Sequence, residues 1–170
     1  MTRLYVLRHA KAASSLPGMR DFDRPLEPIG RTASYKLGEK LAETGFSLDQ
    51  IICSPSLRTR QTLEDITPHF PKPVPTNFVQ ELYTEEWPRY LEIIRNTKCE
   101  GSLMIVGHNP ACEDVVDQLV GGGEKPALRK LLDGFAPGTM AVIDFEVPMT
   151  EIGARMGYLK SLWLDGCARR

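Results

Sequence analysis

Short apolar runs alternate with amphipathic stretches along the 170-residue chain. The apolar runs are typical of buried strands, and they cover residues 3–7, 51–53, 102–106 and 139–147. An alternating stretch from Tyr158 to Leu164 predicts an edge strand. Periodic apolar residues and capping signals predict helices over residues 32–43, 56–66, 86–97 and 113–120.

Prolines and glycines mark the connections between these elements. Residues 11–29 read as a loop, four prolines between residues 68 and 75 predict an extended connection, and the glycine run 121–123 closes the last helix. The segments beside the proline-rich stretch are too small to fold alone, so one domain over residues 1–170 is expected. Strands that alternate with helices predict a three-layer α/β/α fold with a mostly parallel central sheet.

Composition and charge narrow the possible partners. The net charge of −1 supplies no overall basic field for nucleic acid or anionic lipid, so any anion site must be local. The first apolar run is too short for a signal peptide, and none approaches the roughly 18 residues of a membrane helix. The four cysteines form no CxxC pair, which argues against a zinc or redox motif, and Cys53 reads as a core residue. The cytoplasm is the expected compartment.

Candidate chemistry gathers at the ends of three predicted strands. Arg8 and His9 end the first strand, Arg58 follows the second through a Ser-Pro turn, and His108 ends the third. Because ligands of open α/β sheets bind outside the carboxyl ends of the strands, these side chains are expected at one edge of the sheet. Two arginines and two histidines suit a phosphoryl group, which is anionic and which a neutral imidazole can attack.

Each residue has a role in this hypothesis and a plainer alternative. His9 is the candidate nucleophile, although a lone histidine is more often satisfied by the backbone. Arg8 and Arg58 would grip phosphoryl oxygens, and His108 would stabilise charge in the transition state. A surface ion pair, or a helix-start histidine without a ligand, is the plainer interpretation. Arg60 and His69 are predicted to be surface residues.

A carboxyl group is expected to protonate the leaving group. Glu81, with Glu85 and Glu86 behind it, is the candidate, and solvated loop carboxylates are the alternative. Asp21 and Asp23 are predicted to order their loop, and Arg24 is predicted to border the pocket.

Together these segments resemble the histidine phosphatase superfamily, also called phosphoglycerate mutase-like, over roughly residues 3–145. The segments LRHAKA, DFDRPL, SPSLRTRQT and VGHNP are similar to those of its SixA-type phosphohistidine phosphatases. Ala10 stands where much of the superfamily has glycine, as in the SixA-like pattern. The resemblance implies a phosphoglycerate mutase-like fold, a covalent phosphohistidine on His9, and phosphoryl oxygens held by Arg8, Arg58 and His108. It implies no metal and no cofactor.

The substrate is left open by the sequence. A phosphohistidine-bearing protein is the leading candidate, because a short chain leaves little room for segments that cover a small substrate. A small-molecule phosphomonoesterase acting on a sugar phosphate, nucleotide or phosphoglycerate is the alternative among enzymes. A non-catalytic phosphate-recognition module is the alternative outside them, although binding alone needs no nucleophile. The pathway and the oligomeric state do not follow from the sequence.

Overall fold

The computed structural model describes residues 1–164, within which seven strands form one sheet. The strands are β1 (Thr2–Arg8), β2 (Gln50–Cys53), β3 (Thr76–Phe78), β4 (Ser102–Gly107), β5 (Val120–Gly123), β6 (Met140–Phe145) and β7 (Gly157–Trp163). Their order across the sheet is β3-β2-β4-β1-β6-β7-β5. β6 pairs antiparallel with both neighbours, and the other pairs are parallel, so the predicted mostly parallel sheet is confirmed.

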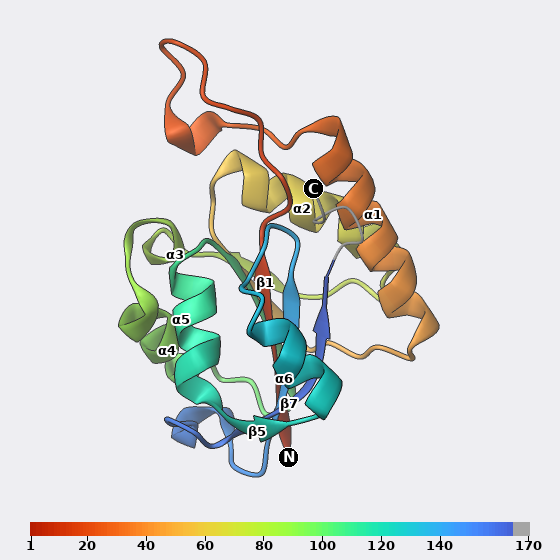
Figure 1. Cartoon of the computed structure of the whole chain (residues 1–170), viewed down its shortest axis with the longest axis vertical. Coiled ribbons are helices and arrows are strands. Elements are labelled where there is room, and N and C mark those ends of the chain that lie inside the picture. Colours follow the sequence, from red (N-terminus) through yellow and green to blue (C-terminus); the bar gives the residue numbers. More distant parts are fainter. Residues whose placement is uncertain (165–170) are drawn as a thin grey trace.

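Helices cover both faces of this sheet and produce the predicted three layers (Figure 1). The α-helices of the described residues are α1 (Pro28–Glu43), α2 (Leu57–Ile66), α3 (Glu81–Thr84), α4 (Trp87–Asn96), α5 (Ala111–Leu119) and α6 (Lys125–Leu131). Helices α1 and α2 pack on one face, whereas α4, α5 and α6 pack on the other. None of these helices is long and apolar enough to cross a membrane.

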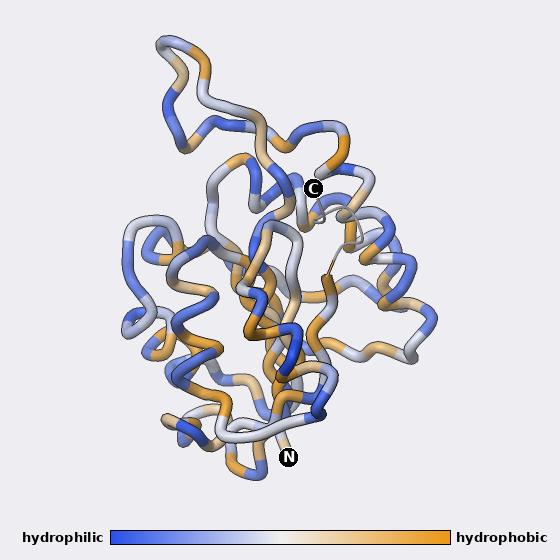
Figure 2. The backbone as a smooth tube through the Cα atoms, viewed as in Figure 1, coloured by the Kyte–Doolittle hydropathy of each residue, from blue (hydrophilic) through white to orange (hydrophobic). Residues whose placement is uncertain are grey.

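The central strand β1 is apolar on both faces because each face meets a helical layer. Leu4 and Val6 join the core under α4, α5 and α6, whereas Tyr5 and Leu7 join the core under α1 and α2. Hydrophobic colouring accordingly concentrates on the central strands, while hydrophilic residues lie mostly on the outer helices and loops (Figure 2). Cys53 is fully buried in the second of these cores, as its position in the strand predicts.

Several predictions about the elements were wrong or incomplete. The glycine run does not simply close a helix: it forms β5, which pairs outside β7, so β7 is not the edge strand. Glycine suits this strand because a Cβ on Gly123 would lie 2.5 Å from the backbone oxygen of Leu159. The sequence analysis also missed β3, α3 and α6, whose three, four and seven residues are too short to show a period.

The loop between β1 and α1 stands out beyond the carboxyl edge of the sheet (Figure 1). An isolated antiparallel bridge joins Ala12 to Leu26 at its base. Arg24 Nη1 donates to the carbonyl of Ala13 at 3.2 Å, and a 3-10 helix, Asp21–Asp23, forms part of the loop. The loop is therefore an ordered projection beside the strand ends.

Candidate active site

Three adjacent strands bring the predicted residues together. β2, β4 and β1 are neighbours in the sheet and run parallel, so their carboxyl ends meet at one edge. His9 directly follows β1, His108 directly follows β4, and Arg58 lies in the first turn of α2 after β2. The rings of His9 and His108 lie 5.1 Å apart between centroids. This is the edge at which open α/β sheets bind their ligands.

His9 is fixed as a neutral imidazole with one free nitrogen lone pair. Its Nδ1 lies 2.7 Å from the carbonyl oxygen of Ala10, and because a carbonyl only accepts, Nδ1 carries the proton. Nε2 therefore keeps its lone pair, toward which Arg58 Nε donates at 3.3 Å. Burial, outweighing the Ala10 hydrogen bond, lowers the pKa of His9 to about 4, and the charges of Arg58 and Arg8 lower it further. The geometry suits a nucleophile.

The two arginines approach the histidines from different elements. Arg58 is 5% exposed, and its two terminal nitrogens donate to Asp21. Arg8 Nη1 donates at 2.7 Å to the carbonyl of Phe135, while its buried Nε has no hydrogen-bond partner among the described residues. The positive charge of Arg8 lowers the pKa of both His9 and His108, so it reaches the space between them despite following the strand alternation.

His108 is held by side chains of three other segments. Its Nε2 lies 2.8 Å from Ser54 Oγ, and its backbone N–H donates to the hydroxyl oxygen of Tyr90 at 3.2 Å. Tyr90 in turn donates to the carbonyl of Leu82. Burial lowers the pKa of His108 to about 3, and the neighbouring His9 and Arg58 lower it further. A neutral His108 carries one ring N–H, which an oxyanion can accept.

Tyr83 and Asp21 complete the rim of the site, and neither had a predicted role in the chemistry. The Tyr83 ring packs edge-on against His108 at 5.6 Å, and its hydroxyl donates to Asp21 Oδ2 at 3.0 Å. Asp21 also pairs with Arg24, which lies at the border of the site as predicted. Asp21 does order the loop, as predicted, but it does so by binding Arg58. The DFDRPL segment signalled this loop, whereas nothing in the sequence signalled Tyr83.

Three of the other polar residues have their contacts elsewhere. Glu81 opens α3 and pairs with Arg89 at 3.2 Å, and the hydrogen bonds from its own backbone and from Arg89 lower its pKa. Arg60 is exposed, as predicted. The prediction of a surface position for His69 was wrong: this ring is half-buried and packs edge-on against Tyr35 at 4.4 Å, because α1 passes over it. Within residues 1–164, no three His, Cys, Asp or Glu side chains are grouped to hold a metal ion.

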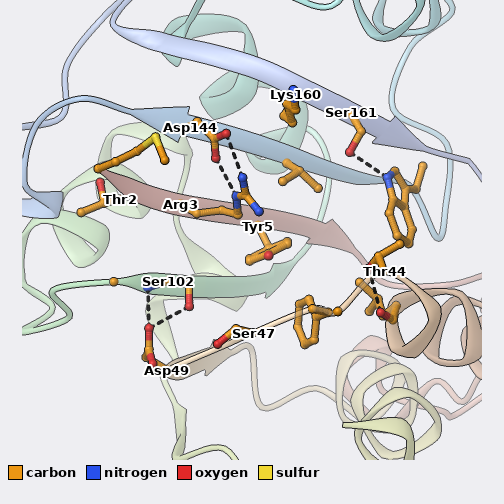
Figure 3. A pocket seen from close by; sticks show the side chains of 17 residues that line it. Thr2, Arg3, Tyr5, Thr44, Ser47, Asp49, Ser102, Asp144, Lys160 and Ser161 are labelled. Atoms are coloured by element: carbon orange, nitrogen blue, oxygen red, sulfur yellow. Dashed lines mark hydrogen bonds and ion pairs between the residues drawn. The ribbon is translucent and has the colours of Figure 1, made fainter. Parts of the chain in front are cut away.

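A separate pocket of about 420 Å³ lies near the start of β1, at the opposite end from His9 (Figure 3). Arg3 and Asp144 form a two-point ion pair across it, with distances of 2.6 and 2.9 Å. Asp49 accepts hydrogen bonds from the backbone and hydroxyl of Ser102, each at 2.8 Å. These charged groups pair with one another within the pocket, so the anion-binding groups of the molecule lie at the other edge.

Comparisons with known proteins agree with this geometry. The family model described as "Histidine phosphatase superfamily (branch 1)" matches residues 4–95, which is more than half of the chain. An uncharacterised chloroplastic protein of Arabidopsis thaliana is 28% identical over 133 residues, which is 72% of this chain. The chain spans only 61% of the length of that relative.

Solved structures extend the comparison to nearly the whole chain. A protein of Agrobacterium tumefaciens assigned as a SixA phosphohistidine phosphatase superposes with a TM-score of 0.82 and is 31% identical, covering 96% of this chain and 97% of its own. The protein histidine phosphatase SixA in complex with tungstate has a TM-score of 0.75 at 21% identity, covering 95% and 96% of the two chains, and so supports the fold. The chain therefore belongs to the histidine phosphatase superfamily, a family of phosphatases, and SixA-type proteins are among its relatives.

Proposed function

We propose that the chain is a phosphohydrolase that works through a covalent phosphohistidine on His9. The observation that carries the proposal is the protonation of His9: Nδ1 is tied to the Ala10 carbonyl, and the Nε2 lone pair faces Arg58. In the first step Nε2 bonds to phosphorus, and the bond between phosphorus and the leaving group breaks. In the second step water attacks phosphorus, which yields inorganic phosphate and regenerates neutral His9.

The surrounding groups suit the charge of a transferring phosphoryl group. Arg8 and Arg58 supply two fixed positive charges, and His108 supplies a neutral N–H donor beside them. Such preorganised donors stabilise developing negative charge without needing to reorient. In this proposal the cationic side chains perform the charge stabilisation, and neither a metal nor a cofactor takes part.

For the substrate, we propose a protein phosphohistidine. The support is the likeness to SixA-type proteins, one of them named as a protein histidine phosphatase. A small-molecule phosphomonoester is the competing substrate, and binding without turnover is the competing function. The described cysteines Cys53, Cys99 and Cys112 are free and buried, which suits the proposed cytoplasmic location. Cys167 lies outside the described residues.

Glu81 is the proposed proton donor to the leaving group. Its pairing with Arg89 favours the ionised carboxylate, so it must be released from Arg89 before it can act as an acid. A phosphohistidine makes a small demand on this acid, because an imidazole leaving group takes up a proton near neutral pH.

The test measures phosphate release from a phosphohistidine protein, phosphoserine and phosphotyrosine peptides, 3-phosphoglycerate and an aryl phosphate. We expect selective release from phosphohistidine by the wild type and none by His9→Ala. The control is His69→Ala, which removes a histidine outside the site and should retain turnover. Selective release from 3-phosphoglycerate would replace the proposed substrate. Turnover by His9→Ala would contradict the covalent mechanism, and tungstate binding without any turnover would favour the recognition module.

A further inference from the structure

Asp21 holds both terminal nitrogens of Arg58. Its backbone carbonyl accepts a hydrogen bond from Nη1 at 2.8 Å, and its carboxylate Oδ2 accepts one from Nη2 at 3.0 Å. The remaining nitrogen, Nε, points its proton at His9 Nε2. Since a guanidinium is planar, two contacts on one side and one on the other fix its orientation relative to the nucleophile.

The carboxylate of Asp21 is itself held from two further directions. Tyr83 donates its hydroxyl to Oδ2 at 3.0 Å, and Arg24 pairs with Oδ1 at 3.0 Å. Burial opposes ionisation of Asp21, but the Tyr83 hydrogen bond and the positive charges of Arg58 and Arg24 outweigh it and lower its pKa. An ionised Asp21 thus joins the loop, the rim and α2 at one point.

We propose that Asp21 is a positioning residue, which aims Arg58 at a phosphoryl group on His9 without touching the reacting atoms. This inference rests on the proposed phosphohydrolase function. Without Asp21, both terminal nitrogens of Arg58 lose the acceptors described above, and the long side chain regains rotational freedom. A misplacement of about 1 Å can lower a rate by roughly 10²-fold.

The effect on binding is expected to differ from the effect on rate. Asp21 carries a negative charge beside the space for an anionic phosphoryl group, so its removal also removes a repulsion. Loss of orientation lowers kcat, while relief of repulsion offsets any weakening of substrate binding. A split between kcat and KM therefore distinguishes positioning from a collapse of the whole site.

Asp23 provides a matched control within the same 3-10 helix. It pairs with Arg20 at 2.6 Å, and both side chains are well exposed. The base of the loop is held independently of both aspartates, by the bridge between Ala12 and Leu26 and by the hydrogen bond from Leu26 N–H to Gln61. Replacement of either aspartate should therefore leave the base of the loop in place.

The experiment compares Asp21→Ala, Asp21→Asn and Asp23→Ala in the wild-type and Arg58→Ala backgrounds, with an aryl phosphate as substrate. Asp21→Ala should lower kcat by about 10–100-fold with less than about a threefold change in KM. Asp21→Asn keeps an acceptor for Arg58 and should recover part of the loss, and Asp23→Ala should match the wild type. In the Arg58→Ala background, Asp21→Ala should have little further effect, because the two residues act as one unit.

A second measurement needs no turnover. The Nε–H signal of Arg58 in an NMR spectrum, identified by its loss in Arg58→Ala, should be sharp in the wild type and in Asp23→Ala but broadened in Asp21→Ala. An unchanged signal in Asp21→Ala, or an equal loss of kcat with and without Arg58, would overturn the positioning role. A wild type that lacks turnover but shows the expected NMR change would overturn the proposed function alone.

Discussion

Acid should destabilise the protein through His9, and the size of the effect follows from its burial. The unfolded chain takes up a proton at an ordinary histidine pKa of roughly 6.5, whereas folded His9 does so at about 4. As the pH falls from 6.5 to 4, the unfolded state gains a proton that the folded state does not. The free energy of unfolding therefore falls across this window, is fully present above it, and levels off below it.

The magnitude comes from the difference in pKa. The pKa of His9 is 6.5 in the unfolded reference and about 4 in the folded protein, and each unit corresponds to about 1.36 kcal/mol. The product is about 3 kcal/mol, which needs no reduction for solvent screening because His9 is only 8% exposed. His108 acts in the same direction, since its own pKa falls to about 3 and the neighbouring His9 is part of the cause.

Urea unfolding followed by tryptophan fluorescence measures this quantity at pH 7, 6, 5 and 4 in phosphate-free buffers, because a bound anion would stabilise the folded state. Carboxylates titrate in the same window, so the informative quantity is the difference between variants. The loss of stability between pH 7 and 4 should be smaller by about 3 kcal/mol in His9→Gln than in the wild type or in His69→Gln. Parallel curves for the wild type and His9→Gln would refute the reasoning.

Two other predictions concern single residues. If Glu81 protonates the leaving group, Glu81→Gln should lower kcat at least about tenfold more for phenyl phosphate than for p-nitrophenyl phosphate, whose leaving group needs less acid help; equal losses would remove Glu81 from this role. Gly107→Ala should destabilise the fold by about 1–3 kcal/mol, because its Cβ would lie 2.5 Å from the Tyr90 hydroxyl. Thermal unfolding checks this, with Gly122→Ala as the control, since a Cβ there meets nothing within 4 Å. Equal melting temperatures for these two variants would contradict the steric argument.

The sequence predicted the histidines and arginines well because each follows an apolar strand, and parallel strands bring their ends to one edge. His9, His108 and Arg58 needed only this rule. The grip of Asp21 on Arg58 could not be predicted, because it depends on the path of an irregular loop without a period. The surroundings of Glu81 depend on α3, which is a single turn of helix, and the pairing of Glu81 with Arg89 is set by tertiary packing.

The place of β1 in the sheet has a consequence for how the chain folds. β1 is made first, yet its two partners are β4 and β6, which end at Gly107 and Phe145. During synthesis the apolar strand Leu4–Leu7 therefore waits with both edges unpaired until most of the chain has emerged. Such long-range pairing slows folding, and unpaired apolar edges favour aggregation. Chains truncated before β4 should accordingly aggregate or bind chaperones, and enzymatic activity should appear late, as a reporter of the completed sheet.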